Sequence, residues 1–118
     1  MEDAIYSPYY SKLRDVRVSI QSSMYDNYSA AFFAKKLGIS LSHFQHLYKQ
    51  FFGVSFQQDS ISMRINYAKD LLETTDLSMD IISEQCGYKN TVHFYRQFKA
   101  TVGQTPANYR KHFRNLLF

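Results

Sequence analysis

The sequence predicts an all-α fold of about seven helices, with two helix-turn-helix units joined by a long linker helix. Apolar residues recur at helical spacing along the chain, and no alternating strand pattern extends beyond chance. A short residue pattern also occurs twice, at an offset of 50 residues. The chain of 118 residues fits one domain, which we divide into a first unit (7–54), the linker helix (55–75) and a second unit (76–115).

The first unit is expected to contain three helices. Ser7 and Pro8 suit the start of the first helix, because serine can cap a helix and proline fits its first position. The polar segment 23–28 should end this helix. The other two helices each have a serine cap and a glycine stop: Ser29 and Gly38, then Ser40 and Gly53. The apolar residues expected in the core are Leu13, Val16, Ile20, Phe33, Ala34, Leu37, Phe44, Leu47, Tyr48 and Phe51.

The linker helix should begin at Ser55 and end near residues 74–76, and the second unit then repeats a short helix followed by a longer one. The starts and stops expected in this unit are, in order, Ser78, Gly87, Asn90 or Lys89, Gly103, the Thr105-Pro106 pair and Arg114. The apolar residues expected to point inward are Ile61, Ile65, Ala68, Leu71, Leu72, Ile81, Ile82, Cys86, Phe94, Phe98 and Val102.

The internal repeat is the most informative feature of the chain. Residues 43–49 align with residues 93–99, with His, Phe and Lys at the same places. The glycines that end the two longer helices, Gly53 and Gly103, match at the same offset of 50. Ahead of them the offset is 49, so the second turn is one residue longer; the matched residues are Ala34 with Ser83 and Gly38 with Gly87.

This duplicated unit has the spacing of a helix-turn-helix. A small residue stands where the two helices cross, a glycine follows four residues later in the turn, and Phe44 or Phe94 anchors the second helix. In DNA-binding versions the outer face of the second helix enters the major groove. Ordinary packing of two short helices could produce one such copy. Two copies, each with polar or basic residues on the second helix, favour DNA binding.

Composition narrows the choice of function without deciding it. The net charge of +4 and a sequence pI of about 9.2 favour polyanionic partners only weakly. No apolar run approaches the ~20 residues of a membrane span, so no membrane association is expected. Residues 1–10 carry two acids and no basic, apolar leader, which predicts a cytoplasmic protein. A single cysteine, Cys86, allows no internal disulfide and no metal cluster.

From about Tyr9 to Phe113 the chain resembles the DNA-binding domain of the AraC/XylS family of bacterial transcription regulators. The stretches that carry the resemblance to its C-terminal signature are 81–88, 94–99 and 103–110. Those similar to its first unit and linker helix are 37–40, Phe44, 48–49, Gly53, 64–65, Ala68 and 71–72. The chain departs from the family pattern at Asp59-Ser60, where an aromatic-aliphatic pair is usual, at Ser83 for Ala and at Cys86 for Val.

The resemblance implies a rigid linker helix that holds two recognition helices about one DNA turn apart, ~34 Å. One domain would then read two successive major-groove segments. The positions that match the family's base-contacting ones are Ser42, Gln45, His46, Val92, His93 and Arg96. Among them, Gln45 suits adenine, the Arg96 fork suits guanine, and Val92 offers only apolar contact, for instance to a thymine methyl.

Phosphate contacts are expected from basic side chains and from caps at helix N-termini. The candidates are Ser40, His43, Lys49, Ser55, Thr91, Lys99, Arg110 and Lys111. The lysines, like Gln45, could instead be plain solvated residues. Arg96 could be a surface salt-bridge partner, and His46 could lie against phosphate. His43 and His93 could pack against neighbouring helices, and the two lack the close spacing of zinc ligands, so no metal or cofactor is expected.

Two other classes of function compete with DNA binding. No catalytic motif is present, and Cys86 falls at a core position, so we do not expect an enzyme. The alternative is a helical protein-interaction module without DNA binding, which would need a large exposed apolar patch. The resemblance implies contact with RNA polymerase and an effector-binding or dimerisation domain. No such domain fits here, and the first ten residues look like a linker, which favours a piece of a longer regulator.

Overall fold

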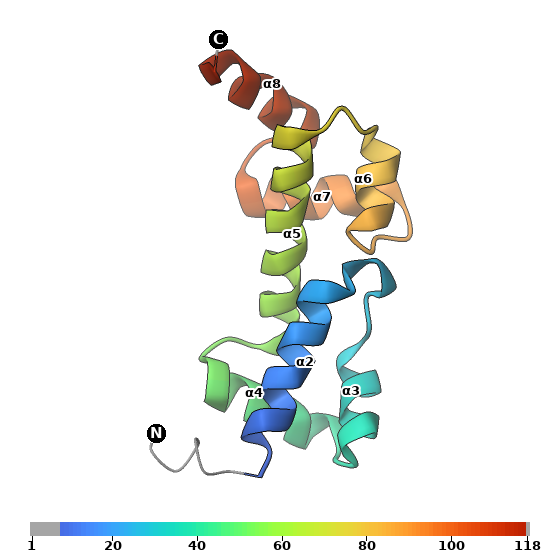
Figure 1. The fold of residues 1–118 in the computed structure, drawn as a ribbon, viewed down its shortest axis with the longest axis vertical. Coiled ribbons are helices and arrows are strands. Elements are labelled where there is room, and N and C mark those ends of the chain that lie inside the picture. Colours follow the sequence, from blue (N-terminus) through green and yellow to red (C-terminus); the bar gives the residue numbers. More distant parts are fainter. Residues whose placement is uncertain (1–7, 118) are drawn as a thin grey trace. The chain divides into compact units, whose positions relative to one another are not determined.

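The computed structural model describes residues 8–117, and every regular element in this range is helical (Figure 1). This confirms the predicted fold class and the number of α-helices. The elements are α2 (Tyr10–Ser22), the 3₁₀ helix η1 (Met24–Asp26), α3 (Ala30–Leu37), α4 (Leu41–Phe52), α5 (Phe56–Thr74), α6 (Met79–Gln85), α7 (Thr91–Val102) and α8 (Pro106–Leu117). No helix among the described residues is long and apolar enough to cross a membrane.

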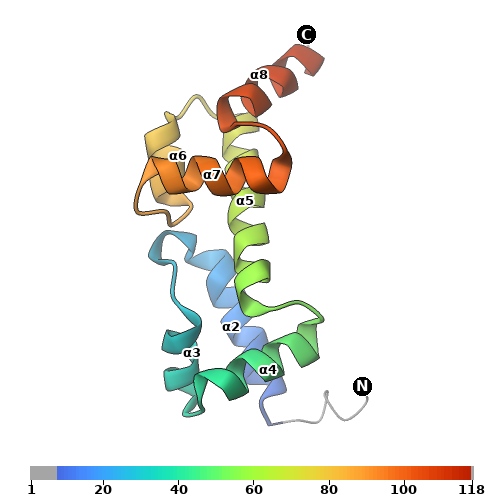
Figure 2. The same cartoon turned by 180° about the vertical axis from the view of Figure 1, so that it is seen from behind.

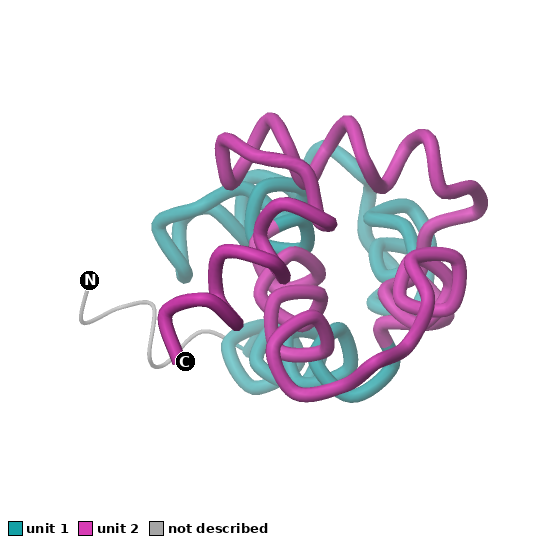
Figure 3. The backbone as a smooth tube through the Cα atoms, turned by 90° about the horizontal axis from the view of Figure 1, so that it is seen from above, with its two compact units in different colours: residues 1–23, 28–61 teal, residues 24–27, 62–118 magenta. Residues whose placement is uncertain are grey.

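The described chain forms two compact units (Figure 3). Unit 1 holds residues 8–23 and 28–61, and unit 2 holds residues 24–27 and 62–117. Helix α5 begins in unit 1 and ends in unit 2. The assignment of η1 to unit 2 is not apparent from the sequence. The finer division into 7–54, 55–75 and 76–115 stays a prediction.

An aromatic cluster forms the core of unit 1. Phe56, the first residue of α5, has ring centroids of Phe33, Phe44 and Tyr48 within 5.4 to 5.8 Å. Edge-to-face pairs at this spacing each add about 0.5–1.5 kcal/mol beyond the burial of their area. One face of α2 closes this core, through the buried residues Leu13, Val16 and Ile20. The core therefore joins α2, α3, α4 and the start of α5.

The core of unit 2 is built from α5, α6 and α7. Its fully buried side chains include Ala68, Leu72, Ile82, Cys86, Phe94 and Phe98. The prediction that Ile81 points inward is wrong, because its side chain is 42% exposed. The buried face of α6 is centred on Ile82 and Ser83, and Ile81 lies at its edge, about 100° around the helix from Ile82.

The predicted caps organise most helix starts. The hydroxyl oxygens of five residues each accept a hydrogen bond from a backbone N–H three residues on: Ser29, Ser40, Ser55, Ser78 and Thr105. The first helix differs, because α2 begins at Tyr10 and Pro8 lies in the preceding turn. Ser7 lies outside the described residues. The last helix continues past Arg114 to Leu117.

Candidate nucleic-acid interface

The first helix-turn-helix consists of α3, a three-residue turn and α4 (Figure 1). Ala34 is buried where α3 packs against α4. Gly38 then takes a left-handed conformation with φ of 73°, which side chains with a Cβ rarely adopt. The Ser40 hydroxyl accepts from the His43 N–H at 3.0 Å and starts α4. This local sequence therefore sets the direction in which α4 leaves the turn.

Helix α4 separates a buried face from a polar one. Phe44 and Tyr48 are fully buried. The predicted base-reading residues Ser42, Gln45 and His46 are exposed, and so is Lys49 one turn later. Gln45, His46 and Lys49 also line a surface hollow of about 560 Å³ that reaches Ser55 and Gln57. The structure thus brings these predicted contacts together on one side of unit 1.

A buried carboxylate anchors the buried face of α4. Asp59 on α5 accepts hydrogen bonds from the Arg17 guanidinium, at 3.0 and 3.3 Å, and from the Tyr48 hydroxyl. The Arg17 guanidinium also lies 4.8 Å from the ring centre of Phe52. Burial, followed by the bond to Asp59, raises the pKa of Tyr48 far above its usual range. The unusual acid at position 59 is therefore a satisfied link between α2, α4 and α5.

The second helix-turn-helix consists of α6, a longer turn and α7 (Figure 2). Gly87 has φ of 87°, and the Cβ of any other residue there would lie 2.2 Å from the Met24 carbonyl oxygen. The Asn27 side-chain amide donates to the Gly87 carbonyl at 2.8 Å. Thus η1 and the following residue pack closely against this turn.

The start of α7 corrects one prediction. Its cap is Asn90, whose side-chain oxygen accepts from the His93 N–H at 2.8 Å. Thr91, expected as a cap, is instead the first helical residue, and its hydroxyl donates to Asp80 at 2.6 Å. Asn90 was one of two starts that the sequence allowed, and its side chain suits this position as well as serine does.

The outer face of α7 carries a different set of side chains from that of α4. Val92, His93, Arg96 and Lys99 are exposed, as predicted for contacts with DNA, and Val92 has 60% of its surface accessible. Tyr95 is 40% exposed on the same helix, although the sequence reasoning passed over it. The internal repeat contained the signal, because Tyr95 stands 50 residues after Gln45.

The two repeated histidines have ring contacts of similar geometry, although with tyrosines from different parts of the fold. The His43 ring lies edge-on to Tyr9, with centroids 5.6 Å apart, and the His93 ring lies edge-on to Tyr88 at 5.5 Å. Both histidines remain exposed. These contacts support the packing alternative, while the predicted contacts with DNA stay predictions.

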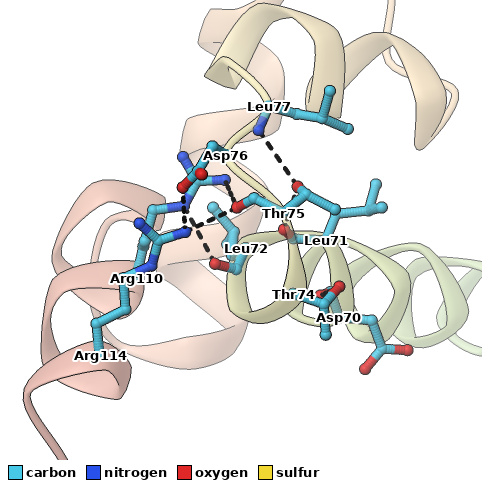
Figure 4. A network of polar contacts seen from close by, with 9 residues as sticks. All are labelled: Asp70, Leu71, Leu72, Thr74, Thr75, Asp76, Leu77, Arg110 and Arg114. Carbon is cyan, nitrogen blue, oxygen red and sulfur yellow. Dashed lines mark hydrogen bonds and ion pairs between the residues drawn. The ribbon is translucent and has the colours of Figure 1, made fainter. Parts of the chain in front are cut away.

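Arg110 has internal partners (Figure 4). Its guanidinium donates to the carbonyl oxygens of Leu72 and Thr75, both at 3.1 Å. Arg114 donates to the same Thr75 oxygen at 2.9 Å and to Asp76 at 2.7 Å. The two arginines thus satisfy carbonyl groups at the end of α5 that have no helical partner. This arrangement gives little support to the predicted phosphate contact of Arg110, whereas Lys111 is exposed.

Charge is distributed unevenly over the helices. Neither α4 nor α7, both described in full, contains an aspartate or a glutamate. The acids of the described residues lie on α2, α5, α6, η1 and the α5–α6 connection: Asp15, Asp26, Asp59, Asp70, Glu73, Asp76, Asp80 and Glu84. Both candidate recognition helices therefore offer donors and positive charge without a competing carboxylate of their own.

The described residues show no second kind of site. In this range, no three His, Cys, Asp or Glu side chains are grouped so that they could hold a metal ion. Cys86 is fully buried, and burial raises the pKa of its thiol to about 12. The thiol is therefore protonated near neutral pH, when a nucleophilic cysteine would need to be a thiolate.

Comparison with known proteins identifies the family. A family model described as a helix-turn-helix domain matches residues 33–112. The arabinose operon regulatory protein of Salmonella typhimurium is 28% identical over 111 residues, which are 93% of this chain and 40% of that protein. The chain thus spans about two fifths of this relative's length.

Two solved structures extend the comparison to the fold. The C-terminal domain of AraT, a response regulator from Geobacillus stearothermophilus, has a TM-score of 0.82 at 29% identity, covering 90% of this chain and 86% of that one. The DNA-binding domain of AdpA, a global transcriptional factor solved with a target DNA, has a TM-score of 0.82 at 26% identity, covering 87% and 93%. The chain belongs to the helix-turn-helix DNA-binding domain family of AraC-type transcription regulators.

Proposed function

We propose that this chain binds double-stranded DNA in a sequence-specific way and thereby regulates transcription, with α4 and α7 as its two recognition helices. The observation that carries the proposal is the duplicated exposed face, which includes polar or basic side chains and no acid, on a helix held by a buried aromatic. The similar AdpA domain was solved with its target DNA, which supports the same use here. The family is one of transcription regulators, which confirms that the chain is not an enzyme.

Each recognition helix would read the group of base pairs that it contacts, which we call its half-site. In the α4 half-site, Gln45 would pair with adenine, with Ser42 and His46 beside it. In the α7 half-site, Arg96 would donate two hydrogen bonds to guanine, with Val92 and His93 beside it. A good bidentate contact of this kind discriminates between bases by about 1–3 kcal/mol.

Contacts with phosphates would add affinity without specificity. Lys49 and Lys99 occupy equivalent exposed positions near the ends of α4 and α7. The N-termini of α4 and α5, capped by Ser40 and Ser55, have free N–H groups that favour anions. We propose that α5 acts as the stiff spacer between half-sites in successive major grooves, about one helical turn of DNA apart.

The remaining roles concern a longer protein. Because the chain spans 40% of the arabinose regulator, we propose that an effector-binding or dimerisation domain accompanies it. Contact with RNA polymerase would link DNA binding to transcription. The cytoplasm, where bacterial DNA lies, is the expected location. Each of these proposals depends on DNA binding by the domain itself.

Gel-shift titration against a random duplex pool at two salt concentrations tests this function. Binding should weaken steeply with salt, because each neutralised phosphate releases counterions. In the sequences selected from the pool, Arg96→Ala should relax preference at one base position, whereas Lys99→Ala should weaken all sequences about equally. Lys12→Ala, a matched change of an exposed lysine on α2, should alter neither. Absence of DNA binding together with salt-independent binding to a protein would contradict the proposal and favour an interaction module.

A further inference from the structure

We infer that α7 reads the 5-methyl group of thymine through Val92 and Tyr95, so that the α7 half-site depends on thymine methyls and the α4 half-site does not. This inference rests on the proposed DNA binding and specifies the chemistry that α7 recognises. It adds Tyr95 to the residues that determine specificity. In this arrangement Tyr95, in place of His93, is the third base contact of α7.

The internal repeat places Tyr95 at the interface. Its counterpart in α4, at the offset of 50, is Gln45, which is exposed and lines the hollow beside α4. Tyr95 is 40% exposed although it is an aromatic residue next to the fully buried Phe94. It lies three residues after Val92, and residues at this spacing are neighbours on a helix surface. Val92 and Tyr95 therefore form one exposed apolar surface adjacent to Arg96.

The neighbours of His93 explain why Tyr95 takes the third contact of α7. The His93 ring lies edge-on to Tyr88, and His43 lies edge-on to Tyr9 in the same way. Tyr9 precedes α2 and Tyr88 lies in the α6–α7 turn, so the two histidines have similar aromatic contacts with tyrosines that the repeat does not relate. Positions 42, 45 and 46 in α4 correspond to 92, 95 and 96 in α7, which leaves His93 outside the equivalent set.

The two sets of side chains recognise different chemistry. In α4, Ser42 and Gln45 can donate and accept hydrogen bonds, as suits the polar edges of base pairs. In α7, the corresponding Val92 and Tyr95 present a branched aliphatic chain and an aromatic ring. Only thymine shows a methyl group in the major groove of unmodified DNA, and apolar side chains are its usual partners. A thymine next to a guanine read by Arg96 would fit this surface.

Uracil substitution in the DNA tests the inference directly, because uracil lacks only the 5-methyl group of thymine. An operator selected from a random pool is first divided into half-sites, using the base positions at which Gln45→Ala and Arg96→Ala relax preference. Each thymine is then replaced singly by uracil, and dissociation constants are measured at fixed salt. Loss of one buried methyl group should weaken wild-type binding about fourfold in the α7 half-site. It should change binding less than twofold in the α4 half-site.

Variants of the protein identify the side chains involved. Tyr95→Ala and Val92→Ala should each abolish the uracil effect at one thymine, and Tyr95→Phe should keep it. Gln45→Ala, the matched change in α4, should weaken binding but leave the uracil effect in the α7 half-site intact. Thermal melting checks that each variant is folded, as expected for exposed positions.

Two kinds of failure can be told apart. If no duplex is bound at any salt concentration, the DNA-binding function itself fails and the inference with it. If DNA is bound but the α7 half-site contains no thymine, or uracil has the same effect in both half-sites, only the inference is overturned. Retention of the uracil effect in both Tyr95→Ala and Val92→Ala would also overturn it.

Discussion

The two helix-turn-helix units share a sequence pattern but hold their second helices, α4 and α7, by different means. Tyr48 and Phe98 stand at equivalent positions, and both are fully buried. The Tyr48 hydroxyl donates to Asp59, which also binds Arg17. Phe98 has no polar atom and packs edge-on against Tyr109 at 5.7 Å. At this position α4 is therefore anchored through a buried charge and α7 through aromatic packing, although other residues of α7 make hydrogen bonds, such as Gln97 with the Tyr88 hydroxyl.

The two turns also differ in what their glycines accomplish. A Cβ built on Gly38 would meet no atom within 4 Å, so only its φ of 73° requires glycine there. At Gly87 the φ of 87° is combined with the close approach of the Met24 carbonyl oxygen. Glycines at matching positions of the repeat are thus required for different structural reasons. The additional residue of the second turn accompanies the contact with η1.

The largest effect should come from Gly87→Ala. The left-handed backbone costs about 1–2 kcal/mol with a Cβ, and displacement of the Met24 carbonyl adds about 1–3 kcal/mol. We expect a loss of about 4 kcal/mol in the free energy of unfolding, measured by urea denaturation. Gly38→Ala is the matched control and should cost only about 1–2 kcal/mol. Equal losses in the two variants would contradict the difference between the turns.

Next in size is Asp59→Ala in unit 1. The change leaves the Tyr48 hydroxyl and the Arg17 guanidinium without their shared acceptor. Breaking a buried pair costs about 3–5 kcal/mol, and because Arg17 retains access to water we expect about 3 kcal/mol. Asp76→Ala in unit 2, an exposed acid bonded to Arg114, should cost less than about 1 kcal/mol. Urea denaturation measures both losses, provided that the dependence of the unfolding free energy on urea concentration keeps the same slope. A loss under 1 kcal/mol for Asp59→Ala would show that water replaces the carboxylate as the partner of Tyr48 and Arg17.

Local features of the fold were predictable from the sequence. Caps such as Ser29 and Ser78, and the glycines that follow the helices, act over three or four residues, so the sequence alone indicates them. The internal repeat added information of longer range, because it indicated that the two units have the same helix-turn-helix structure. Ile81 shows the limit of this reasoning, because a short helix buries a narrow face and periodicity alone did not fix its centre.

Contacts between distant residues could not be predicted in the same way. Arg17 and Asp59 lie 42 residues apart, and Arg110 and Leu72 lie 38 apart. The neighbouring sequence does not distinguish an arginine that caps a distant helix from an arginine that is available to bind a phosphate. Gln45 and Arg96, which the repeat constrains, are exposed as their predicted roles require, whereas Arg110 has internal partners that its local sequence did not reveal.

A smaller change, Tyr48→Phe, gives unit 1 the residue type that unit 2 has at this position. The change removes the hydrogen bond from Tyr48 to Asp59, while Arg17 still donates to that carboxylate. We therefore expect the free energy of unfolding to fall by about 1–2 kcal/mol near neutral pH. Burial and Asp59 raise the pKa of Tyr48 above its unfolded value near 10, so its contribution is complete below pH 10 and decreases as pH rises further.

The same variant should therefore show a shallower loss of stability above pH 10 than the wild type. Burial raises the pKa of Tyr88 to about 12, and this residue is still present in the variant. Part of the loss of stability above pH 10 should therefore remain. Urea denaturation between pH 7 and pH 11 measures the difference. Parallel pH profiles for wild type and variant would mean that Tyr48 ionises no differently in the folded and unfolded chains.

The smallest effects should separate Arg110 from its neighbour Lys111 on α8. Arg110→Ala removes two bonds to carbonyl oxygens of α5 and should cost about 1 kcal/mol of stability, while the salt dependence of DNA binding stays the same. Lys111→Ala should change stability by less than about 0.5 kcal/mol. If Lys111 contacts a phosphate, its loss reduces the slope of log K against log salt by about 0.9. A reduced slope for Arg110→Ala would instead mean that this arginine leaves α5 to bind DNA.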